Sequence, residues 1–333
     1  MPGGSDPAVG AGRERVAAID CGTNSIRLLV ADLDPASGTQ RDLDRRLRIV
    51  RLGEGVDSTG RIADAALERT YVACAEYAAA IADLGAPPLR FCATSAARDA
   101  RNAGDFVAGV HERLGVRPEV IDGAEEARLT AHGATRSLVG LTGPSGGPLA
   151  APMLVVDIGG GSTELVSTGI GGPEVLALVS LDVGSVRLTE RHLLDDPPTA
   201  RQVARARADV DAALDGAGTV RLAGVRTVIG VGGTATTVAA ATLRLDHYDS
   251  TAIHRAQLPL EQVVSSCESL LHMRVAQRRE LPFMHPGRAD VIGGGALVLE
   301  RVLRRLASTL ADDRVVVSEH DILDGIAWSM VAP

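Results

Sequence analysis

The chain has 333 residues, of which 45% are apolar and 2% aromatic, and its formal net charge is −8. This length accommodates two hydrophobic cores, and an acidic chain with few rings argues against a nucleic-acid-binding surface, which needs basic side chains and aromatic stacking. Every fixed side-chain cation is an arginine, so a Walker-type phosphate loop, whose Gly-Lys-Ser/Thr motif requires lysine, is excluded.

The cysteines show neither a CxxC motif nor a histidine at metal-ligand spacing; they are Cys21, Cys74, Cys92 and Cys267. We therefore expect small buried side chains in a reducing cytoplasm. Residues 1–14 are rich in Gly, Pro and Ala and predict a flexible tail rather than a signal peptide. No stretch approaches 18 uninterrupted apolar residues, so we expect no membrane-spanning segment.

The first half of the chain alternates apolar strands with amphipathic helices. We expect strands over 15–21, 26–32, 47–52, 89–94 and 117–121, and helices over 63–84, 96–114 and about 123–138. The turn-rich segment GLTGPSGGPLAAP, residues 140–152, is typical of an exposed joint between two halves.

The second half opens with the same order of elements. We expect strands over 153–157, 163–168, 174–181, 226–231 and 313–317, and helices across 184–216, over 233–243, in further segments to about 307, and over 320–330. Hairpins feeding a strand–helix alternation predict an α/β fold with mixed sheets covered by helices. We expect one domain over 15–135, joined by the last helix at about 319–333, and a second over 136–318, facing each other across a ligand-binding cleft.

One sequence device occurs twice, in AAIDCGTNSIRLLV (residues 17–30) and VVDIGGGSTELV (residues 155–166). Each has an apolar strand, an aspartate, a glycine-containing polar turn, a serine and another apolar strand. When Asp20 is aligned with Asp157, the coincident pairs are Gly22/Gly159, Ser25/Ser162 and Leu28/Leu165. A single copy is equally compatible with an ordinary tight hairpin, but two aligned copies favour paired phosphate-binding loops.

Such turns bind phosphate through successive backbone N–H groups, and glycines that adopt positive φ allow a close approach to the backbone. Expected phosphate-binding residues of the two turns are Gly22, Thr23, Asn24, Ser25, Gly159, Gly160, Gly161, Ser162 and Thr163. A third turn, Gly232-Gly233-Thr234, opens a helix whose N-terminus is another anion site. The carboxylates of Asp157 and Glu164 would repel a bare phosphate, so they predict a cation between them, and Mg²⁺ suits carboxylate ligands.

The segment IDGAEEARLTAHG follows a strand and opens a helix. Asp122 and Glu125 have the spacing of a capping box, which gives Glu125 a structural role. Glu126 is not needed for the cap, and it could either complement the helix dipole or act in catalysis.

The opposed Asp-Gly hairpins and the late strand–Gly-Gly-Thr–helix resemble the actin-like ATPase and sugar-kinase superfamily. Within it, the chain resembles the exopolyphosphatase/guanosine pentaphosphate phosphohydrolase family from residue 17 to about 326. The matching stretches, in order, are AIDCGTNSIRLLVAD, RLGEGVDSTGRI, FCATSAARDARN, VIDGAEEARLTAHG, VVDIGGGSTELV, SLDVGSVRLTE, VGGTATTVAA, GRADVIGGGALVLERVL and SEHDILDGI.

The resemblance implies two actin-like (ribonuclease H-like) domains and a homodimer. It places the catalytic glutamate of the family on Glu126 and a phosphate-contacting arginine on Arg98. We expect Glu126 to activate water, Glu164 to share in catalysis, and Mg²⁺ to be held directly or through water by Asp157, Glu164 and Asp20. Two departures from the family are Thr23, which replaces a serine but keeps the hydroxyl, and the glycines at 293–295.

The expected function is hydrolysis of the terminal phosphoanhydride of polyphosphate. The sibling activity removes the 5′ γ-phosphate of guanosine pentaphosphate, for which the shortage of aromatic side chains is unfavourable. Some members of the family carry an added C-terminal domain that we do not expect here, and this expectation favours shorter chains as substrates. A small-molecule kinase and a non-catalytic, actin-related nucleotide binder are the alternatives from other classes.

Overall fold

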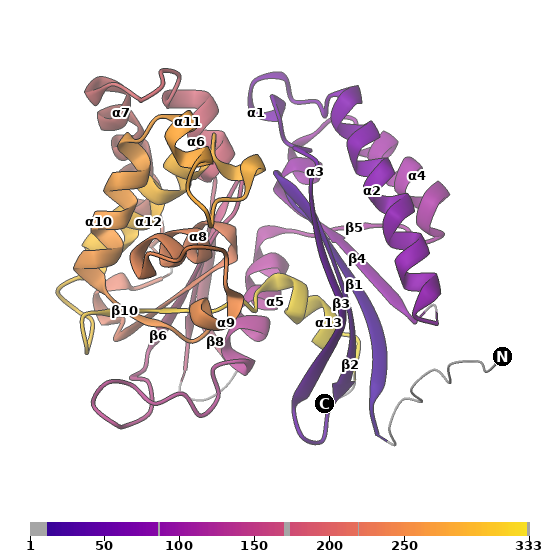
Figure 1. Cartoon of the computed structure of the whole chain (residues 1–333), viewed down its shortest axis with the longest axis horizontal. Coiled ribbons are helices and arrows are strands. Elements are labelled where there is room, and N and C mark those ends of the chain that lie inside the picture. The colour runs from indigo at the N-terminus through magenta and orange to yellow at the C-terminus, as the bar shows by residue number, and fades with distance from the viewer. Residues whose placement is uncertain (1–11, 86, 170–173, 219, 332–333) are drawn as a thin grey trace.

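A computed structural model describes residues 12–85, 87–169, 174–218 and 220–331. Two lobes, each built on a mixed β-sheet, stand beside each other with two helices between them (Figure 1). The predicted α/β fold with two mixed sheets is confirmed. Most of the predicted flexible tail, residues 1–11, lies outside the described part of the chain.

The first lobe has a five-stranded sheet in the order β3-β2-β1-β4-β5. Its strands are β1 (Glu14–Cys21), β2 (Ser25–Asp34), β3 (Thr39–Ile49), β4 (Leu89–Ala93) and β5 (Glu119–Val120), and its helices are α1 (Val56–Thr59), α2 (Asp64–Asp83), α3 (Ser95–Asp99) and α4 (Ala103–Leu114). Apolar side chains of β1 and β2 pack against α2 and α4 on the outer face of this sheet.

The second lobe has a six-stranded sheet in the order β10-β11-β9-β6-β7-β8. Its strands are β6 (Met153–Ile158), β7 (Thr163–Thr168), β8 (Val175–Leu181), β9 (Thr227–Val231), β10 (Gln257–Pro259) and β11 (Arg314–Val317). Its α-helices are α6 (Ser185–His192), α7 (Ala200–Asp215), α8 (Gly232–Leu243), α9 (Ser250–Ile253), α10 (Leu260–His272), α11 (Val275–Arg279) and α12 (Ile292–Leu306). In both lobes an antiparallel hairpin is extended by a parallel strand, so the two lobes share one plan.

The two helices between the lobes are exchanged. The chain enters α5 (Gly123–Arg136) from β5, yet the alanine-rich face of α5 packs on β6, β7 and β9 of the second sheet. Conversely, α13 (Ile322–Trp328) follows β11 but packs on β1 and β2 of the first sheet. Each sheet therefore has its inner face covered by a helix that the chain reaches from the other lobe.

These two helices cross at a pair of glycines. A Cβ atom on Gly133 of α5 would overlap with the carbonyl oxygen of Asp321, and one on Gly325 of α13 would overlap with that of Leu129. Glycine is therefore required on both helices, because any side chain at either position would drive the crossing helices apart.

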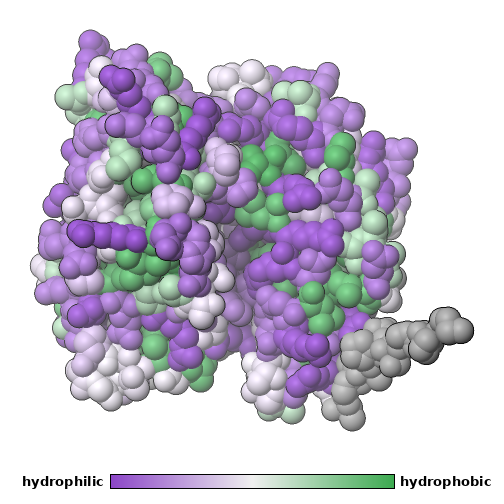
Figure 2. All heavy atoms as spheres, in the orientation of Figure 1, coloured by the Kyte–Doolittle hydropathy of each residue, from purple (hydrophilic) through white to green (hydrophobic). Residues whose placement is uncertain are grey.

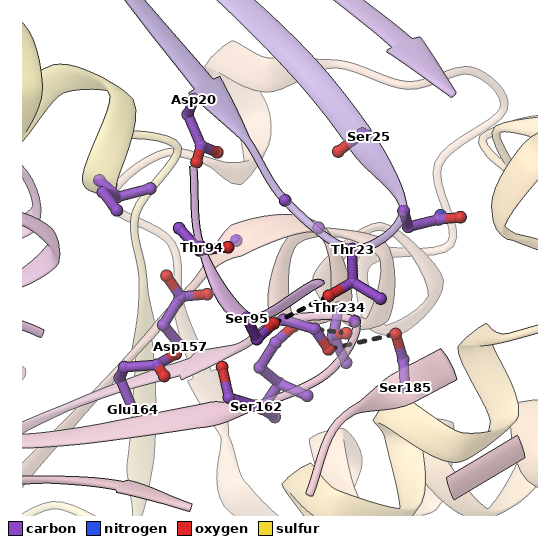
Figure 3. Close-up of a pocket in the computed structure, with 18 of the residues that line it drawn as sticks. Asp20, Thr23, Ser25, Thr94, Ser95, Asp157, Ser162, Glu164, Ser185 and Thr234 are labelled. Atoms are coloured by element: carbon purple, nitrogen blue, oxygen red, sulfur yellow. Dashed lines mark hydrogen bonds between the residues drawn. The ribbon is translucent and has the colours of Figure 1, made fainter. Parts of the chain in front are cut away.

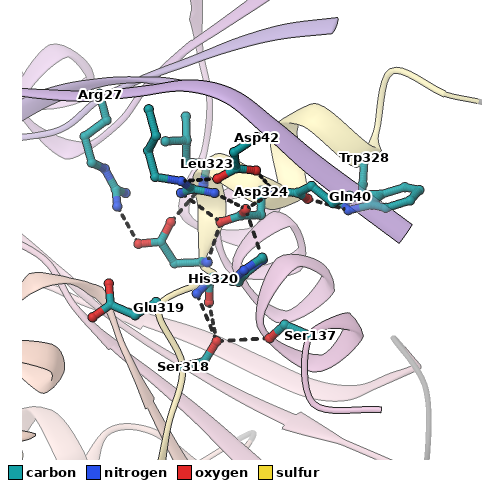
Figure 4. A network of polar contacts seen from close by, with 12 residues as sticks. Arg27, Gln40, Asp42, Ser137, Ser318, Glu319, His320, Leu323, Asp324 and Trp328 are labelled. Atoms are coloured by element: carbon teal, nitrogen blue, oxygen red, sulfur yellow. Dashed lines mark hydrogen bonds and ion pairs between the residues drawn. The ribbon is translucent and has the colours of Figure 1, made fainter. Parts of the chain in front are cut away.

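A buried polar network fixes α13 to the first lobe (Figure 4). Asp324 is fully buried and accepts hydrogen bonds from Gln40 at 2.7 Å and from Arg45 at 2.5 Å, and the Trp328 indole N–H donates to Gln40 at 2.9 Å. Burial alone would raise the pKa of Asp324, but Arg45 and His320 hold that pKa well below its usual range. The network keeps a charged aspartate buried because hydrogen-bonding partners surround it.

The structure corrects several predicted elements. The strand expected over 47–52 is the longer β3, an edge strand whose many charged residues hide any alternating pattern. The helix expected over 96–114 is divided into α3 and α4, because the Asn102 side chain bonds the backbone N–H and C=O of Ile62 instead of continuing a helix. No pattern in the sequence indicated α1 or β10, which are four and three residues long.

Among the described residues, no helix combines the length and apolar character needed to cross a bilayer.

Candidate active site

The duplicated device forms two equivalent β-hairpin turns. The backbone N–H of Gly22 donates to the carbonyl oxygen of Ser25 at 2.9 Å, and that of Gly159 donates to the carbonyl oxygen of Ser162 at 3.0 Å. The first turn joins β1 to β2 and the second joins β6 to β7. The sequence alignment of Asp20 with Asp157 therefore corresponds to a structural repeat.

The two turns face each other and touch. A Cβ atom on Gly160 would lie 2.6 Å from the Cβ of Thr23, and one on Gly161 would lie 2.7 Å from the Ser95 hydroxyl oxygen. Glycine permits a positive φ at residues 159–161, but none of these three glycines has one. Gly160 and Gly161 are glycines because Thr23 and Ser95 of the first lobe leave no room for a side chain.

A pocket opens beside this contact (Figure 3), at the hollow between the lobes that is visible in Figure 2. The residues proposed from the sequence that line it are Asp20, Gly22, Thr23, Asn24, Ser25, Glu126, Asp157, Gly159, Gly160, Ser162, Glu164, Gly232, Gly233 and Thr234. The fold thus brings together residues from both hairpins, from α5 and from the N-terminus of α8.

Carboxylates concentrate in this pocket. Asp157 and Glu164 are register partners on β6 and β7, and Figure 3 shows their side chains next to each other. Burial raises the pKa of Asp157 well above its usual range, with further contributions from Asp321 and Glu164. Burial also raises the pKa of Glu164 to about 7, although hydrogen bonds from Ser180 and Ser162 oppose the shift. Negative charge here is therefore costly unless a cation compensates it.

Glu126 lies at the first turn of α5 and is 8% exposed. Burial, together with the Glu164 carboxylate, raises its pKa well above the usual range, while Arg98 opposes the shift. The Arg98 guanidinium donates to Glu126 Oε2 at 3.2 Å and to the carbonyl oxygen of Ile121 at 3.0 Å. A carboxylate held in this way in a pocket is suited to accept a proton from water.

The neighbouring glutamate has a different environment. Asp122 caps α5 by accepting a hydrogen bond from the Glu125 backbone N–H at 2.8 Å, as the capping-box spacing predicted. The Glu125 side chain does not reach back to the cap but pairs with Arg90 at 3.5 Å and Arg128 at 3.6 Å. Glu125 thus points to Arg90 and Arg128, whereas Glu126, the next residue of the same helix, points into the pocket.

The third glycine turn closes the pocket at the start of α8. Gly232 has a φ of 72°, and a Cβ atom there would overlap with Oδ1 of Asp157. The Thr234 hydroxyl donates to the carbonyl oxygen of Ile158 at 3.1 Å. Glycine at 232 is therefore required both by the backbone conformation and by the position of the aspartate.

Three of the expected phosphate-binding residues do not line the pocket. The Arg98 guanidinium contacts Glu126, as described above. Thr163 is fully buried, and its hydroxyl donates to the Val183 carbonyl oxygen at 2.6 Å. Gly161 lies against Thr23 and Ser95, and its carbonyl oxygen accepts a hydrogen bond from Arg187 at 2.6 Å. The alternation of strand residues explains Thr163, because Thr163 and Ser162 point to opposite sides.

The expected metal-ligand set is also incomplete as a direct site. Within the described ranges, no group of three or more His, Cys, Asp or Glu side chains is arranged to hold a metal ion. Asp20 lines the pocket, but its Oδ2 accepts two hydrogen bonds from Arg27, at 2.6 and 3.0 Å. Asp157, by contrast, has one long side-chain hydrogen bond, 3.3 Å from the Thr130 hydroxyl.

Sequence reasoning missed two arginines that line the pocket. Arg27 of β2 joins Asp20 to Asp321, whose Oδ2 it contacts at 2.5 Å. Arg288 precedes α12 and reaches the pocket from the second lobe. Arg27 lies in the strand that follows the first turn, and the alternation of side chains along that strand could have indicated that it points into the pocket. Nothing in the local sequence distinguishes Arg288 from the other arginines.

A set of ion pairs joins the lobes beside the touching turns, where α6 approaches α1 and α3 (Figure 1). Arg187 of α6 contacts Asp57 at 2.6 Å and Asp99 at 2.5 Å, and Arg191 contacts Asp57 at 2.6 Å. Glu190 accepts a hydrogen bond from the Gly55 backbone N–H at 3.1 Å. We call this group the α6 latch, because it connects the second glycine turn, through Gly161, to the first lobe.

Comparison with known proteins shows a family relationship over almost the whole chain. The model of the Ppx/GppA phosphatase family matches residues 29–330. Exopolyphosphatase 2 of Mycobacterium tuberculosis is 49% identical over 324 residues, which cover 95% of this chain and 98% of that protein.

Solved structures of proteins from this family have the same fold. The crystal structure of an exopolyphosphatase-like protein is 45% identical, with a TM-score of 0.87, and the match covers 96% of this chain and 98% of that one. The Ppx/GppA family member of Aquifex aeolicus is 29% identical, with a TM-score of 0.74 and coverage of 96% and 97%.

Proposed function

The chain belongs to the Ppx/GppA phosphatase family, and we propose that it is an exopolyphosphatase, which hydrolyses the terminal phosphoanhydride of inorganic polyphosphate and releases orthophosphate. The observation that carries the proposal is the meeting of two equivalent glycine turns beside a buried carboxylate, Glu126. Backbone N–H groups of opposed turns suit a terminal phosphate, and a carboxylate in the same pocket suits the activation of water.

Glu126 acts as the general base that removes a proton from the attacking water. Its raised pKa makes it a better proton acceptor than an ordinary glutamate. Arg98 is a positioning residue, because its bond to Oε2 and its anchor on Ile121 fix the direction of the carboxylate. The turns at residues 22–25 and 159–162 and the start of α8 hold the terminal phosphate in line with that water.

Magnesium is the cofactor we propose, and the residues present fit it. Asp157 and Glu164 are adjacent and buried, and their raised pKa values show that negative charge on both is unfavourable. A divalent cation between them would offset this charge. Mg²⁺ keeps several waters and typically takes one or two carboxylates together with phosphate oxygens of the substrate, so the lack of a third protein ligand is compatible with it. When bound, it neutralises the charge that develops on the transferring phosphoryl group.

Polyphosphate is favoured over guanosine pentaphosphate as the substrate. The likeness to an exopolyphosphatase over 95% of the chain supports polyphosphate. A kinase would transfer the phosphate to an acceptor hydroxyl, and a non-catalytic nucleotide binder would form no product. Analysis of the products therefore distinguishes both from a hydrolase, which releases orthophosphate.

We further propose that the protein is a cytoplasmic homodimer. The four cysteines are buried and unpaired, which suits a reducing compartment. Sedimentation equilibrium over a range of protein concentrations tests the dimer, and a constant monomer mass would contradict it.

The decisive experiment measures orthophosphate release from polyphosphate, guanosine pentaphosphate and ATP in the presence of Mg²⁺. We expect polyphosphate to be the best substrate, and Glu126→Gln to lower the rate by about a hundredfold or more, because general-base catalysis contributes on this order. Glu125→Gln is the matched control, since it removes the same charge one residue away from a side chain that pairs with surface arginines.

Equal losses in the two glutamate variants would contradict the assignment of Glu126. Removal of Mg²⁺ by a chelator should abolish release by the wild type, and an unchanged rate would contradict the proposed cofactor. No release from any polyphosphate by the wild type would reject the proposed function itself.

A further inference from the structure

Three polar side chains form a row across the sheet of the second lobe. Asp157 of β6 is the register partner of Glu164 of β7, and Glu164 is in turn the register partner of Ser180 of β8. Directly opposed residues of antiparallel strands point to the same face of a sheet, so the three side chains share one face. The two carboxylates of the proposed magnesium site are therefore followed, at the edge of the sheet, by a hydroxyl.

The hydroxyl of Ser180 contacts Glu164 from behind. It donates a hydrogen bond of 2.7 Å to Oε1 of Glu164, whose residue is 1% exposed. Among the described residues, Glu164 lines the candidate active-site pocket and Ser180 does not. Hydrogen bonds to an ionised group are short and strong, so this one holds the carboxylate firmly. Because Ser180 lies outside the pocket, its hydroxyl acts on a bound group through Glu164.

The other carboxylate of the row is held more loosely. Asp157 accepts its side-chain hydrogen bond from the Thr130 hydroxyl of α5, and that bond is 3.3 Å long. At this distance a hydrogen bond is weaker than one of 2.7 Å. Glu164 is therefore the carboxylate whose direction the protein itself determines more closely, and Ser180 is the side chain that determines it.

The start of α5 lies directly on Ser180. A Cβ atom on Gly123, the first residue of α5, would be 2.5 Å from the Cβ of Ser180 and 2.8 Å from its hydroxyl oxygen. Glycine at 123 therefore leaves the room in which the hydroxyl turns toward Glu164. The helix also limits the positions open to the hydroxyl, so packing supports the hydrogen bond.

We propose that Ser180 is a positioning residue of the active site, whose hydroxyl fixes the Glu164 carboxylate in the direction that binds Mg²⁺. This inference rests on the proposed function and on the proposed cofactor. A hydrogen-bonding partner behind a metal ligand orients that ligand, and its loss lowers metal affinity by about tenfold to a hundredfold. Ser180 is thereby assigned to metal binding, and the activation of water remains with Glu126.

The test compares Ser180→Ala with Ser266→Ala in metal binding. Ser266 of α10 is also half-buried, accepts a hydrogen bond of 2.9 Å from the Thr242 hydroxyl and does not line the pocket, so it controls for the loss of one hydroxyl. The probe is Mn²⁺, which takes the same oxygen ligands as Mg²⁺ and whose free form is measured by electron paramagnetic resonance. We expect the Kd for Mn²⁺ to rise about tenfold in Ser180→Ala and to stay unchanged in Ser266→Ala.

Orthophosphate release from polyphosphate gives a second readout. The Mg²⁺ concentration for half-maximal rate should rise by a similar factor in Ser180→Ala, and saturating Mg²⁺ should restore kcat to within about twofold, because the affinity for the ion is what the variant loses. Alanine removes only the hydroxyl oxygen, so the contact with Gly123 is kept. A merely structural fault would lower kcat at every Mg²⁺ concentration.

Two results would overturn the inference. One is a Kd for Mn²⁺ that is the same in Ser180→Ala and in the wild type, and the other is a loss of kcat that saturating Mg²⁺ does not restore. A wild type that binds no Mn²⁺ would overturn the inference together with the proposed cofactor. A wild type that releases orthophosphate from polyphosphate while Ser180→Ala behaves like Ser266→Ala rejects this inference alone and leaves the proposed function intact.

Discussion

Two neighbouring glutamates show how much single residues depend on their surroundings here. Glu125 and Glu126 have the same chemistry and adjacent positions, but α5 rotates one toward Arg90 and Arg128 and the other into the pocket. The capping-box spacing identified the structural role of Asp122 from sequence. The proposed role of Glu126 needed the family resemblance, because first-turn acids are common in helices.

The residue whose substitution tests the pocket most directly is Gly232. We expect Gly232→Ala to destabilise the protein by about 1–2 kcal/mol, the usual cost of a left-handed backbone for a residue with a Cβ, and to abolish orthophosphate release, because the new methyl group displaces Asp157. Chemical denaturation and the release assay measure the two effects.

Gly115→Ala separates these effects. Gly115 has a φ of 70° at the end of α4, and its Cβ position is open space, so the alanine there carries the same strain far from the pocket. It should lose similar stability and keep its activity. Comparable loss of activity in both variants would show that strain, and not the position of Asp157, is responsible.

At the scale of elements, the sequence predicted the repeated hairpins and the strands and helices whose apolar residues are buried. Both Asp-Gly hairpins, the parallel strands β4 and β9 and the long helix α2 follow directly from apolar runs. Elements stabilised by few, distant contacts were missed. The edge strand β3 is largely charged, and the break between α3 and α4 depends on Asn102 reaching Ile62, 40 residues away.

Contacts between elements of different lobes were also beyond sequence reasoning. The α6 latch depends on Arg187 and Arg191, one turn apart on α6, meeting Asp57 of α1 from the other lobe. The position of Arg288 in the pocket is equally a product of tertiary structure. A chain that contains 34 basic residues, all of them arginines, gives no local signal for these particular ones.

We also predict how strongly the ion pairs of the α6 latch are coupled. A double-mutant cycle of Asp57→Ala and Arg187→Ala should give a coupling of roughly 1 kcal/mol in the free energy of unfolding, the upper end for ion pairs near a surface, because Arg187 is largely buried. The coupling should weaken at high salt.

The exposed pair Arg48 and Glu76 lies within the first lobe and serves as the control cycle, for which a smaller coupling is expected. If the two cycles gave the same value, the latch would contribute no more than an ordinary surface pair and could not hold the lobes together.

At the scale of the whole molecule, the crossing of α5 and α13 determines how the lobes meet. The two-sheet architecture could be predicted from the repeat, but the exchange of helices could not, since it depends on where the apolar faces of α5 and α13 come to lie. Gly133 and Gly325 are the residues that allow the crossing. They resemble ordinary helix glycines in the sequence.

We expect Gly325→Ala to destabilise the protein by about 1–3 kcal/mol, the usual range for overpacking, since its Cβ would overlap with the Leu129 carbonyl oxygen. Thermal unfolding measures the loss. Gly104→Ala is the control, because the Cβ position on α4 is open and alanine favours helices there, so its stability should be equal or slightly higher. Equal melting temperatures for both variants would mean that the crossing can relax.

The exchange of helices also sets the order in which the protein is completed during synthesis. The inner face of β1 and β2, with Val16, Ala18 and Leu29, is covered by side chains of residues 322–328. The ribosome delivers those residues only after both sheets have been made, so the half that emerges first keeps a bare apolar surface until residues 322–328 have been synthesised. The nascent N-terminal lobe is therefore the part of this protein most in need of protection by chaperones.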